Sequence, residues 1–386
     1  MYMKCTGMIF LCLYSCFSNA EELKWLNECV GYYQFQLPAN IELAVYPVDD
    51  IIHPQKRSEA IQGEWYKNTN ITFGSYGRSS NDDVTQAQFS NFYYDKYYFG
   101  VSTESKNSID VFAYQKMIKE NFESIVNYRR NVTSYSSEYF NRITSFLIKD
   151  YNDSFAFYKI KSYSLYIFKK NREYDFNGVG YEGKPDESQT VDKFFLDNES
   201  EVLSLLHRFH PRQLYEVPSE PGFCLPYGFV ANDSGHESRN MAVTYRLKDH
   251  PDVTILFQDA SFQYPEMLPE TERGGDRIEN YSAKDFIKWM WSTTYLPSGD
   301  KKIQWSTIEM DGRKGTGSFM KSTARDGHID YGYVGFVRGD PQDSTRKPDL
   351  QVYVVSYGNM TRGYPRMTPD ELKALAEHIV NSVKHR

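Results

Sequence analysis

Apolar and polar residues alternate along much of this chain, which is the pattern of strands with one covered face. The first example is the set Tyr33, Phe35 and Leu37, which alternates with less apolar neighbours until Pro38 ends the run. Aromatic and β-branched runs predict further strands in the first half of the chain at 92–101, 145–149, 155–160 and 163–168. Similar runs predict strands in the second half at 242–247, 253–257, 303–309, 331–337 and 350–356. Strands therefore dominate both halves, and Asp311-Gly312 predicts a hairpin turn after one of them.

Fewer segments have the period of an amphipathic helix. The clearest apolar stripe recurs every three to four residues and comprises Val111, Tyr114, Ile118, Phe122 and Ile125. Two more helices are predicted at 199–209 and from Ser282 onward. The last helix has a complete start signal, in which Thr368 caps the backbone, Pro369 takes the first helical position and Glu371 completes a capping box. The stripe predicted for it comprises Leu372, Leu375, Ile379 and Val383.

Strands with helices set among them predict an α+β fold, and the chain is long enough for two domains. Each domain is expected to contain a mainly antiparallel sheet with packed helices. Segment 211–226 has four prolines and one glycine, a composition that interrupts helices and strands and is typical of a linker. We place the boundary near residue 215, which gives an N-terminal domain at 21–215 and a C-terminal domain at 216–386.

The first twenty residues have the order of a secretory signal peptide. Lys4 precedes an apolar run at 8–13, and the small residues Ser18 and Ala20 follow. The run is too short to span a bilayer, and no later segment is long and apolar enough to do so. The sequence therefore predicts export, with residues 1–20 removed. The alternative is a membrane anchor, because 13–16 resembles a lipoprotein cleavage box that would place a lipid on Cys16.

Only two of the five cysteines, Cys29 and Cys224, lie outside this signal. Free thiols seldom persist in an oxidising compartment, and two cysteines allow a single pairing. A disulfide between them would join the start of the first predicted domain to the start of the second. The alternative is two unrelated buried thiols, which are common inside cells.

Composition excludes one class of partner and suggests another. The net charge is −7 with acidic and basic residues interspersed, so the chain has no basic stripe for nucleic acid. It has 32 Tyr and 25 Phe, which favour half-buried strands. Exposed Tyr is also a common contact residue in protein interfaces, so part of this excess is a candidate binding surface.

The spacings of common catalytic and metal sites are missing. There is no Gly-x-Ser-x-Gly elbow, and His236-Glu237 is followed by Asn240 where a zinc-protease motif needs its second histidine. Segment 312–317 fits a glycine-rich hairpin better than a phosphate loop. A metal shared by His207 and His210 is disfavoured, because basic residues are common at helix C-termini. We therefore predict no catalytic residue, no metal and no cofactor.

Three motifs resemble a family of bacterial immunity proteins, the fourth family directed against type VI secretion lipase effectors. The first is Cys29-Val30-Gly31-Tyr32-Tyr33 running on to Leu37-Pro38, and the second is Pro221-Gly222-Phe223-Cys224 with Gly228-Phe229. The third is the terminal helix from Met367-Thr368-Pro369-Asp370-Glu371 to Ser382-Val383. The segments between 92 and 181 depart from the family pattern, which leaves the identity of the partner open.

The resemblance implies a two-domain α+β protein of the periplasm that binds a cognate phospholipase or lipase effector. It implies that the two domains grip the effector like a claw and inhibit it without chemistry of their own. Loops 269–276 and 339–348 are charged candidates for contact. Two alternatives stay open at this point: a secreted hydrolase whose active site is assembled from distant residues, and a secreted glycoprotein. The second rests on acceptor patterns at Asn70, Asn131, Asn152, Asn198, Asn232, Asn280 and Asn359.

Overall fold

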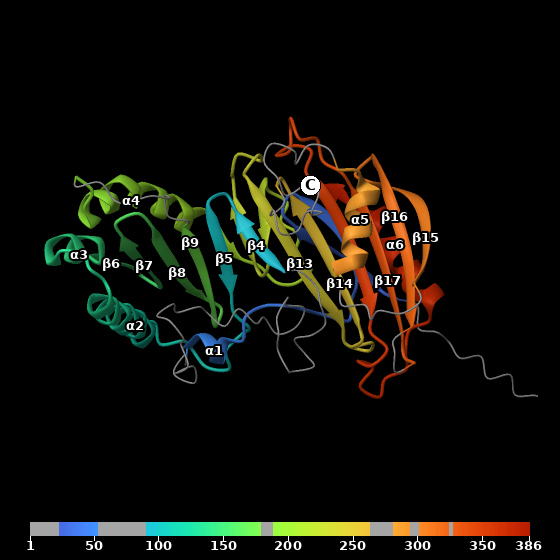
Figure 1. Cartoon of the computed structure of the whole chain (residues 1–386), viewed down its shortest axis with the longest axis horizontal. Helices are drawn as coiled ribbons and strands as arrows, with labels where there is room; N and C mark the ends of the chain where they lie inside the picture. Colours follow the sequence, from blue (N-terminus) through green and yellow to red (C-terminus); the bar gives the residue numbers. More distant parts are fainter. Residues whose placement is uncertain (1–22, 53–89, 179–187, 263–280, 294–300, 324–326) are drawn as a thin grey trace, which may run out of the picture.

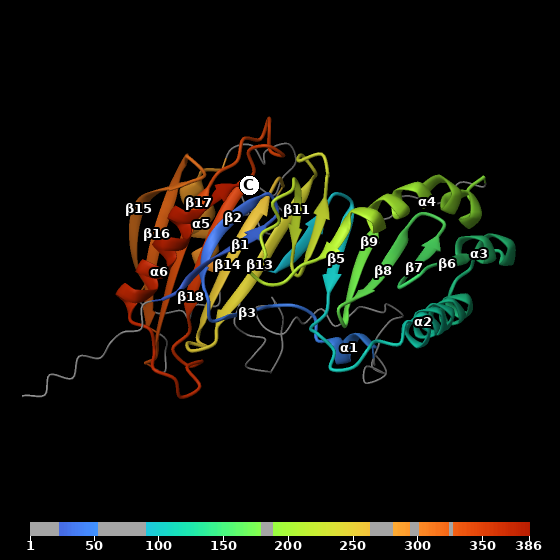
Figure 2. The same ribbon diagram turned by 180° about the vertical axis from the view of Figure 1, so that it is seen from behind.

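One large antiparallel sheet runs through the whole molecule (Figures 1 and 2). The computed structural model describes residues 23–52, 90–178, 188–262, 281–293, 301–323 and 327–386. Its strands, from one edge to the other, are β15 (Lys301–Met310), β16 (Arg313–Thr323), β17 (Ile329–Val337), β18 (Asp349–Ser356), β14 (Val253–Ala260), β13 (Arg239–Leu247), β4 (Asn91–Tyr94), β5 (Tyr97–Val101), β9 (Arg172–Gly178), β8 (Tyr163–Lys169), β7 (Ser154–Lys159) and β6 (Phe146–Tyr151). The pairing of β13 with β4 joins the strands of the first half of the chain to those of the second.

Two smaller sheets lie against the large one. The first contains β1 (Trp25–Val30), β2 (Tyr33–Pro38) and β19 (Lys384–His385), and the second contains β10 (Phe209–Pro211), β12 (Gly228–Ala231) and β11 (Gly222–Leu225). The short strand β3 (Ile41–Leu43) pairs with β13 beside the main path of the large sheet. In the figures, β1 and β2 lie behind the large sheet in Figure 1 and in front of it in Figure 2.

Helices cover both faces of the large sheet. They are α1 (Val48–Ile52), α2 (Val111–Val132), α3 (Ser137–Ile143), α4 (Val191–Arg208), α5 (Ala283–Thr293) and α6 (Pro369–Ser382). On β7, Phe155 and Phe157 pack in the cluster of α2, whereas Ala156 and Tyr158 pack in the cluster that contains buried residues of α4 and α6. Residues of α5 form a separate cluster with side chains of β13, β14, β16, β17 and β18. The alternation of side chains along each strand thus gives both faces of the sheet an apolar surface for helices.

The sequence patterns predicted most of these elements correctly. Strand β2 buries Tyr33, Phe35 and Leu37, while Gln34 and Gln36 on the other face are only half-buried. The fold is α+β, as predicted.

The predicted turns and caps are also present. Asp311 and Gly312 both have positive φ, 52° and 68°, in a two-residue hairpin turn between β15 and β16. Helix α6 begins with the predicted capping box of Thr368 and Glu371.

Three predicted segments differ from the structure. The run 92–101 forms two strands, because Asp95 turns the chain with a φ of 52°. The helix predicted at 199–209 starts earlier, at the cap Thr190. The proline-rich stretch 211–226 is not an unstructured linker. It contains the end of β10 and all of β11, and Pro226 lies in the turn that joins β11 to β12.

Two further sequence predictions concern residues outside the described part of the chain. The signal peptide at 1–20, with its alternative lipid site Cys16, and the charged loop 269–276 both lie there. Among the described helices, none is long and apolar enough to cross a membrane.

Candidate functional site

The predicted disulfide between Cys29 and Cys224 is present and lies at the centre of a buried junction. The two sulfurs are 2.09 Å apart, the Cα atoms are 5.8 Å apart, and neither side chain is exposed. Beside it, the backbone of Gly31 exchanges hydrogen bonds of 2.8 and 2.9 Å with that of Cys224. Gly31 has a φ of +60°, and a Cβ there would lie 2.1 Å from Oδ2 of Asp259. Only glycine fits this position of the junction.

A buried ion pair supports the same junction. Nη2 of Arg212 lies 2.6 Å from Oε1 of Glu28, and both side chains are almost completely inaccessible to solvent. Arg212 also donates to the carbonyl of Cys29 at 2.9 Å and to that of Leu225 at 3.1 Å. The second oxygen of Glu28 accepts from the backbone N–H of Tyr215 at 2.5 Å. Two buried charges need such additional hydrogen bonds, because these replace the contacts with water that burial removes.

The C-terminal segment closes the junction from the other side. Strand β19 pairs with β2, and the backbone N–H of Arg386 donates to the carbonyl of Tyr32 at 3.0 Å. Its guanidinium donates to the carbonyls of Pro218 at 2.7 Å and Glu220 at 2.9 Å, and lies 3.2 Å from Sγ of Cys224. Burial lowers the pKa of Arg386 from its usual value.

A second set of contacts ties the junction to the large sheet. Arg239 on β13 pairs with Asp259 on β14 at 2.8 Å, and its guanidinium lies 4.6 Å from the ring centre of Tyr32. The hydroxyls of Tyr32 and Tyr94 donate to Asp233 at 2.7 and 3.2 Å. Burial raises the pKa of the Asp233 carboxyl, while these hydroxyls act in the opposite direction. The charged residues of the junction are therefore all fixed by protein contacts.

The three sequence motifs thus meet in space. Helix α6 packs on β2, where Nε2 of His378 lies 2.8 Å from Oε1 of Gln36 and the His378 ring stacks on Trp25 at 3.6 Å. Backbone pairing joins the first motif to the second, at Gly31 and Cys224. The sequence identified the cysteines. It did not identify Glu28, Arg212 or Arg386, because a buried ion pair between residues 184 positions apart, 28 to 212, has no local pattern.

A different region has the features of a binding surface. The register of the strands places α2 and α5 on the same face of the large sheet, at its two ends, with β9, β5, β4 and β13 between them (Figure 1). We call this surface the interhelix face. It is defined by the side chains of Tyr93, Tyr98, Asp175, Asn177 and Asn240.

The interhelix face combines aromatic and amide groups. Tyr98 is 46% exposed, and its ring meets that of Tyr93 edge-on at 5.4 Å. Asn177 donates to Asp175, and Asn240 donates to the carbonyl of Phe262 at 2.9 Å. Burial raises the pKa of the Tyr93 hydroxyl from its usual value. Asp175 and Asn240 are buried beneath this face, so the groups it offers a partner are the exposed Tyr98 and the half-buried Tyr93 and Asn177. Aromatic rings with hydrogen-bonding groups are the chemistry of protein interfaces.

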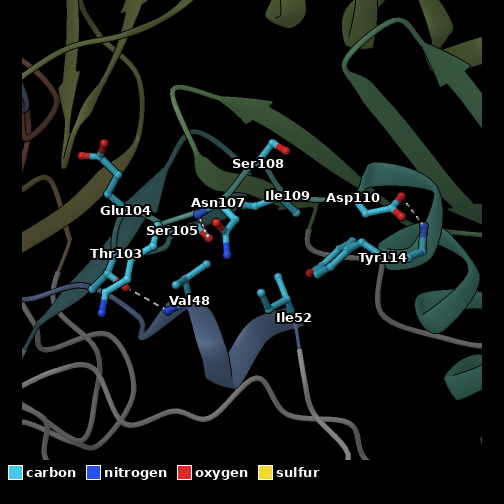
Figure 3. Close-up of a pocket in the computed structure, with 12 residues that line it drawn as sticks. Val48, Ile52, Thr103, Glu104, Ser105, Asn107, Ser108, Ile109, Asp110 and Tyr114 are labelled. Atoms are coloured by element: carbon cyan, nitrogen blue, oxygen red, sulfur yellow. Dashed lines mark hydrogen bonds between the residues drawn. The ribbon is translucent and has the colours of Figure 1, made fainter.

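A pocket of about 630 Å³ lies beyond this face, between α1, the segment 103–110 and the start of α2 (Figure 3). Val48, Ile52 and Tyr114 line its apolar side, and Asp110 caps α2 at its rim. Its lining contains no histidine or cysteine. The pocket can take an apolar group with polar neighbours.

The remaining candidates from the sequence are placed as follows. His207 lies in the last turn of α4 and His210 lies on β10, and no cluster of three or more metal-ligating side chains is found in the described part of the chain. Loop 339–348 is held by ion pairs between Lys347 and Asp340 and between Arg346 and Asp343, each at 3.4 Å. It is an ordered, charged surface segment.

Comparison with known proteins identifies the second half of the chain. Residues 216–386 match the family model of the Tle cognate immunity protein 4 C-terminal domain. A search of curated protein sequences finds no match.

Solved structures share the fold of the whole chain. Apo immunity protein TplEi of the T6SS from Pseudomonas aeruginosa is 17% identical, with a TM-score of 0.52 over 94% of this chain and 97% of that chain. The same protein complexed with an "L" peptide is 16% identical, with a TM-score of 0.50 over 94% of this chain and 98% of that chain. A chain of the Tle4-Tli4 complex is 17% identical, with a TM-score of 0.52 over 94% and 97%. The family resemblance predicted from the three motifs is therefore confirmed: residues 216–386 match the model of the Tle cognate immunity protein 4 C-terminal domain, and solved immunity proteins share the fold of the whole chain.

Proposed function

We propose that this chain is an immunity protein that binds a cognate type VI lipase effector and inhibits it by steric gripping. The observation that carries the proposal is the family match over residues 216–386. A protein with the same fold is part of the Tle4-Tli4 complex, which supports the proposal that this chain also binds a lipase effector. The two domains are taken to be 21–215 and 216–386, and to act together as the grip.

The interhelix face is the surface we assign to the effector. It lies between α2 of the first half and α5 of the second, so a partner bound there would contact both halves at once. The buried junction supports this role, because a surface that is already rigid loses little entropy on binding. Steric inhibition requires no nucleophile, base or metal from the immunity protein.

We infer that the protein acts in the periplasm after export. The Cys29–Cys224 disulfide supports an oxidising compartment. Removal of residues 1–20 as a signal peptide stays a prediction, as does the alternative of a lipid on Cys16. N-terminal sequencing and mass measurement of the exported protein distinguish cleavage after Ala20 from acylation.

Co-purification tests the function. The chain and the lipase encoded beside its gene are co-expressed in the periplasm, and we expect a stoichiometric complex that abolishes lipase activity and toxicity. Tyr98→Ala should weaken the complex about tenfold, as is typical for an aromatic contact residue. Tyr364→Ala is the matched control, since Tyr364 is 50% exposed and lies outside the interhelix face. Failure to recover any complex would contradict the proposed function, whereas equal affinities of the two variants would contradict only the assigned surface.

A further inference from the structure

Strand β15 forms an unusually open edge of the large sheet. It has ten residues and pairs, within the described part of the chain, only with β16. Residues 302–307 are all exposed, and Ile303 and Trp305 each retain 37% of their accessible surface. Long edges with apolar side chains favour pairing with another strand, and proteins usually protect them with proline, a bulge or a covering segment. Strand β15 contains no proline, and its register with β16 is unbroken.

The register determines which backbone groups point outward. The two-residue turn at Asp311-Gly312 makes Met310 and Arg313 a hydrogen-bonded pair. Hydrogen-bonded and non-hydrogen-bonded pairs alternate along an antiparallel ladder, so every odd-numbered residue of β15 directs its N–H and C=O away from β16. The outward-directed set includes Ile303, Trp305, Thr307 and Glu309.

The same odd-numbered residues have their side chains on the face of α5. The ammonium group of Lys284 on α5 lies 5.1 Å from the ring centre of Trp305. Side chains of the even-numbered residues project to the opposite face, where Ile308 and Met310 pack in the cluster of α6. The outward backbone groups and the exposed apolar side chains therefore belong to the same residues.

We propose that β15 pairs antiparallel with β15 of a second copy of this chain, with Trp305 opposite Trp305 across a two-fold axis. In this register Ile303 lies opposite Thr307. Aromatic and β-branched pairs are favourable cross-strand combinations. A shift by two residues in one direction would instead set Ile303 opposite Glu309. The strand is thus self-complementary in the proposed register, as an isologous dimer requires.

A homodimer formed by one strand edge buries little area, so we expect it to dissociate in the micromolar range. Its register gives a direct test by cross-linking. Residues 304 and 306 of the two copies would form a non-hydrogen-bonded pair, whose Cα atoms lie about 4.5 Å apart, within the range of a disulfide. Exported Gln304→Cys and Ser306→Cys variants are each oxidised alone and then as a mixture, and the products are separated on a non-reducing gel.

The proposal predicts a covalent dimer in the mixture and none with either variant alone. A cross-link of Ser306→Cys with itself would indicate a different register and would overturn the proposal. So would a protein that sediments as a monomer at the highest attainable concentration.

A pair of substitutions tests the energetics without a cross-link. Trp305→Ala should raise the dissociation constant of the homodimer about tenfold, because it removes an aromatic pair and its buried area. Leu196→Ala is the matched control, since Leu196 is 70% exposed and belongs to α4, which lies at the other end of the molecule from β15 (Figure 1). Equal dissociation constants for the two variants would overturn the assigned role of Trp305. Both experiments use the protein without its effector, so their outcome is independent of the proposed function.

Discussion

At the scale of single residues, the buried pair Glu28–Arg212 is the contact most sensitive to substitution. Arg212→Met keeps the length of the side chain but leaves the Glu28 carboxylate buried without its cation. We expect the free energy of unfolding to fall by about 3–5 kcal/mol, the usual cost of breaking a buried ion pair from one side. Equilibrium unfolding in guanidinium chloride measures the change.

Lys116→Met is the matched control for this substitution. Lys116 pairs with Glu120 on α2 at 3.7 Å, and both side chains are about 60% exposed. Exposed pairs of this kind contribute less than about 0.5 kcal/mol. Similar losses in the two variants would mean that the junction does not depend on the buried pair.

Other buried polar residues explain why sequence patterns fail locally. Strand β9 was not predicted, and it carries Glu173 and Asp175 on the side facing α2. Both are completely buried, and Glu173 accepts a hydrogen bond from the Tyr114 hydroxyl at 3.2 Å. Two acidic residues within seven positions suggest a solvated loop when only the sequence is considered. Their burial becomes tolerable in the folded protein, where other segments supply hydrogen-bond donors to the carboxylates.

At the scale of elements, the cap of α6 tests how strongly local sequence signals contribute to stability. The Thr368 hydroxyl accepts from the N–H of Glu371 at 3.3 Å, and the Glu371 carboxylate accepts from the N–H of Thr368 at 2.7 Å. Thr368→Ala should lower the free energy of unfolding by about 1 kcal/mol. Glu377→Gln on the exposed side of the same helix should change it by less than about 0.5 kcal/mol. Thermal unfolding of both variants decides the comparison, and equal midpoints would contradict the role of the cap.

Elements with local signals were the ones the sequence predicted best. Asp311-Gly312 specified a turn by its own backbone preference, and Thr368 specified the start of α6. Segment 211–226 was misjudged because its prolines interrupt local periodicity. Its strand β11 is stabilised instead by pairing with β12 and by contact with Arg212 and Gly31.

At the scale of the molecule, the pairing of strands from the two halves of the chain could not be predicted from local sequence patterns. Strand β13 pairs with β3 and with β4, which lie about 150 to 200 residues earlier in the chain, and so continues the sheet of one half into the other. The predicted division near residue 215 therefore separates segments that share one sheet. The pairing of β13 with β4 also creates the interhelix face, because it joins the strands that pack on α5 and the strands that pack on α2 in one sheet.

This continuous sheet leads to a specific expectation for the disulfide. Cys29 and Cys224 are 195 residues apart, and closing a loop of that size stabilises the fold by about 5 kcal/mol in the chain-entropy model. That effect acts on the unfolded chain. In the folded state, the β13 pairings and the contacts of Arg212 and Arg386 hold the same segments together.

We therefore expect a Cys29→Ala/Cys224→Ala double variant to lose several kcal/mol of stability while keeping its shape and its affinity for the effector at temperatures where it is folded. Guanidinium unfolding measures the first quantity, and small-angle scattering with a binding titration measures the other two. A larger radius of gyration or a weaker complex in the folded variant would show that the disulfide itself fixes the arrangement of the two halves. Unchanged values would assign that arrangement to the sheet, and with it the rigidity that steric inhibition requires.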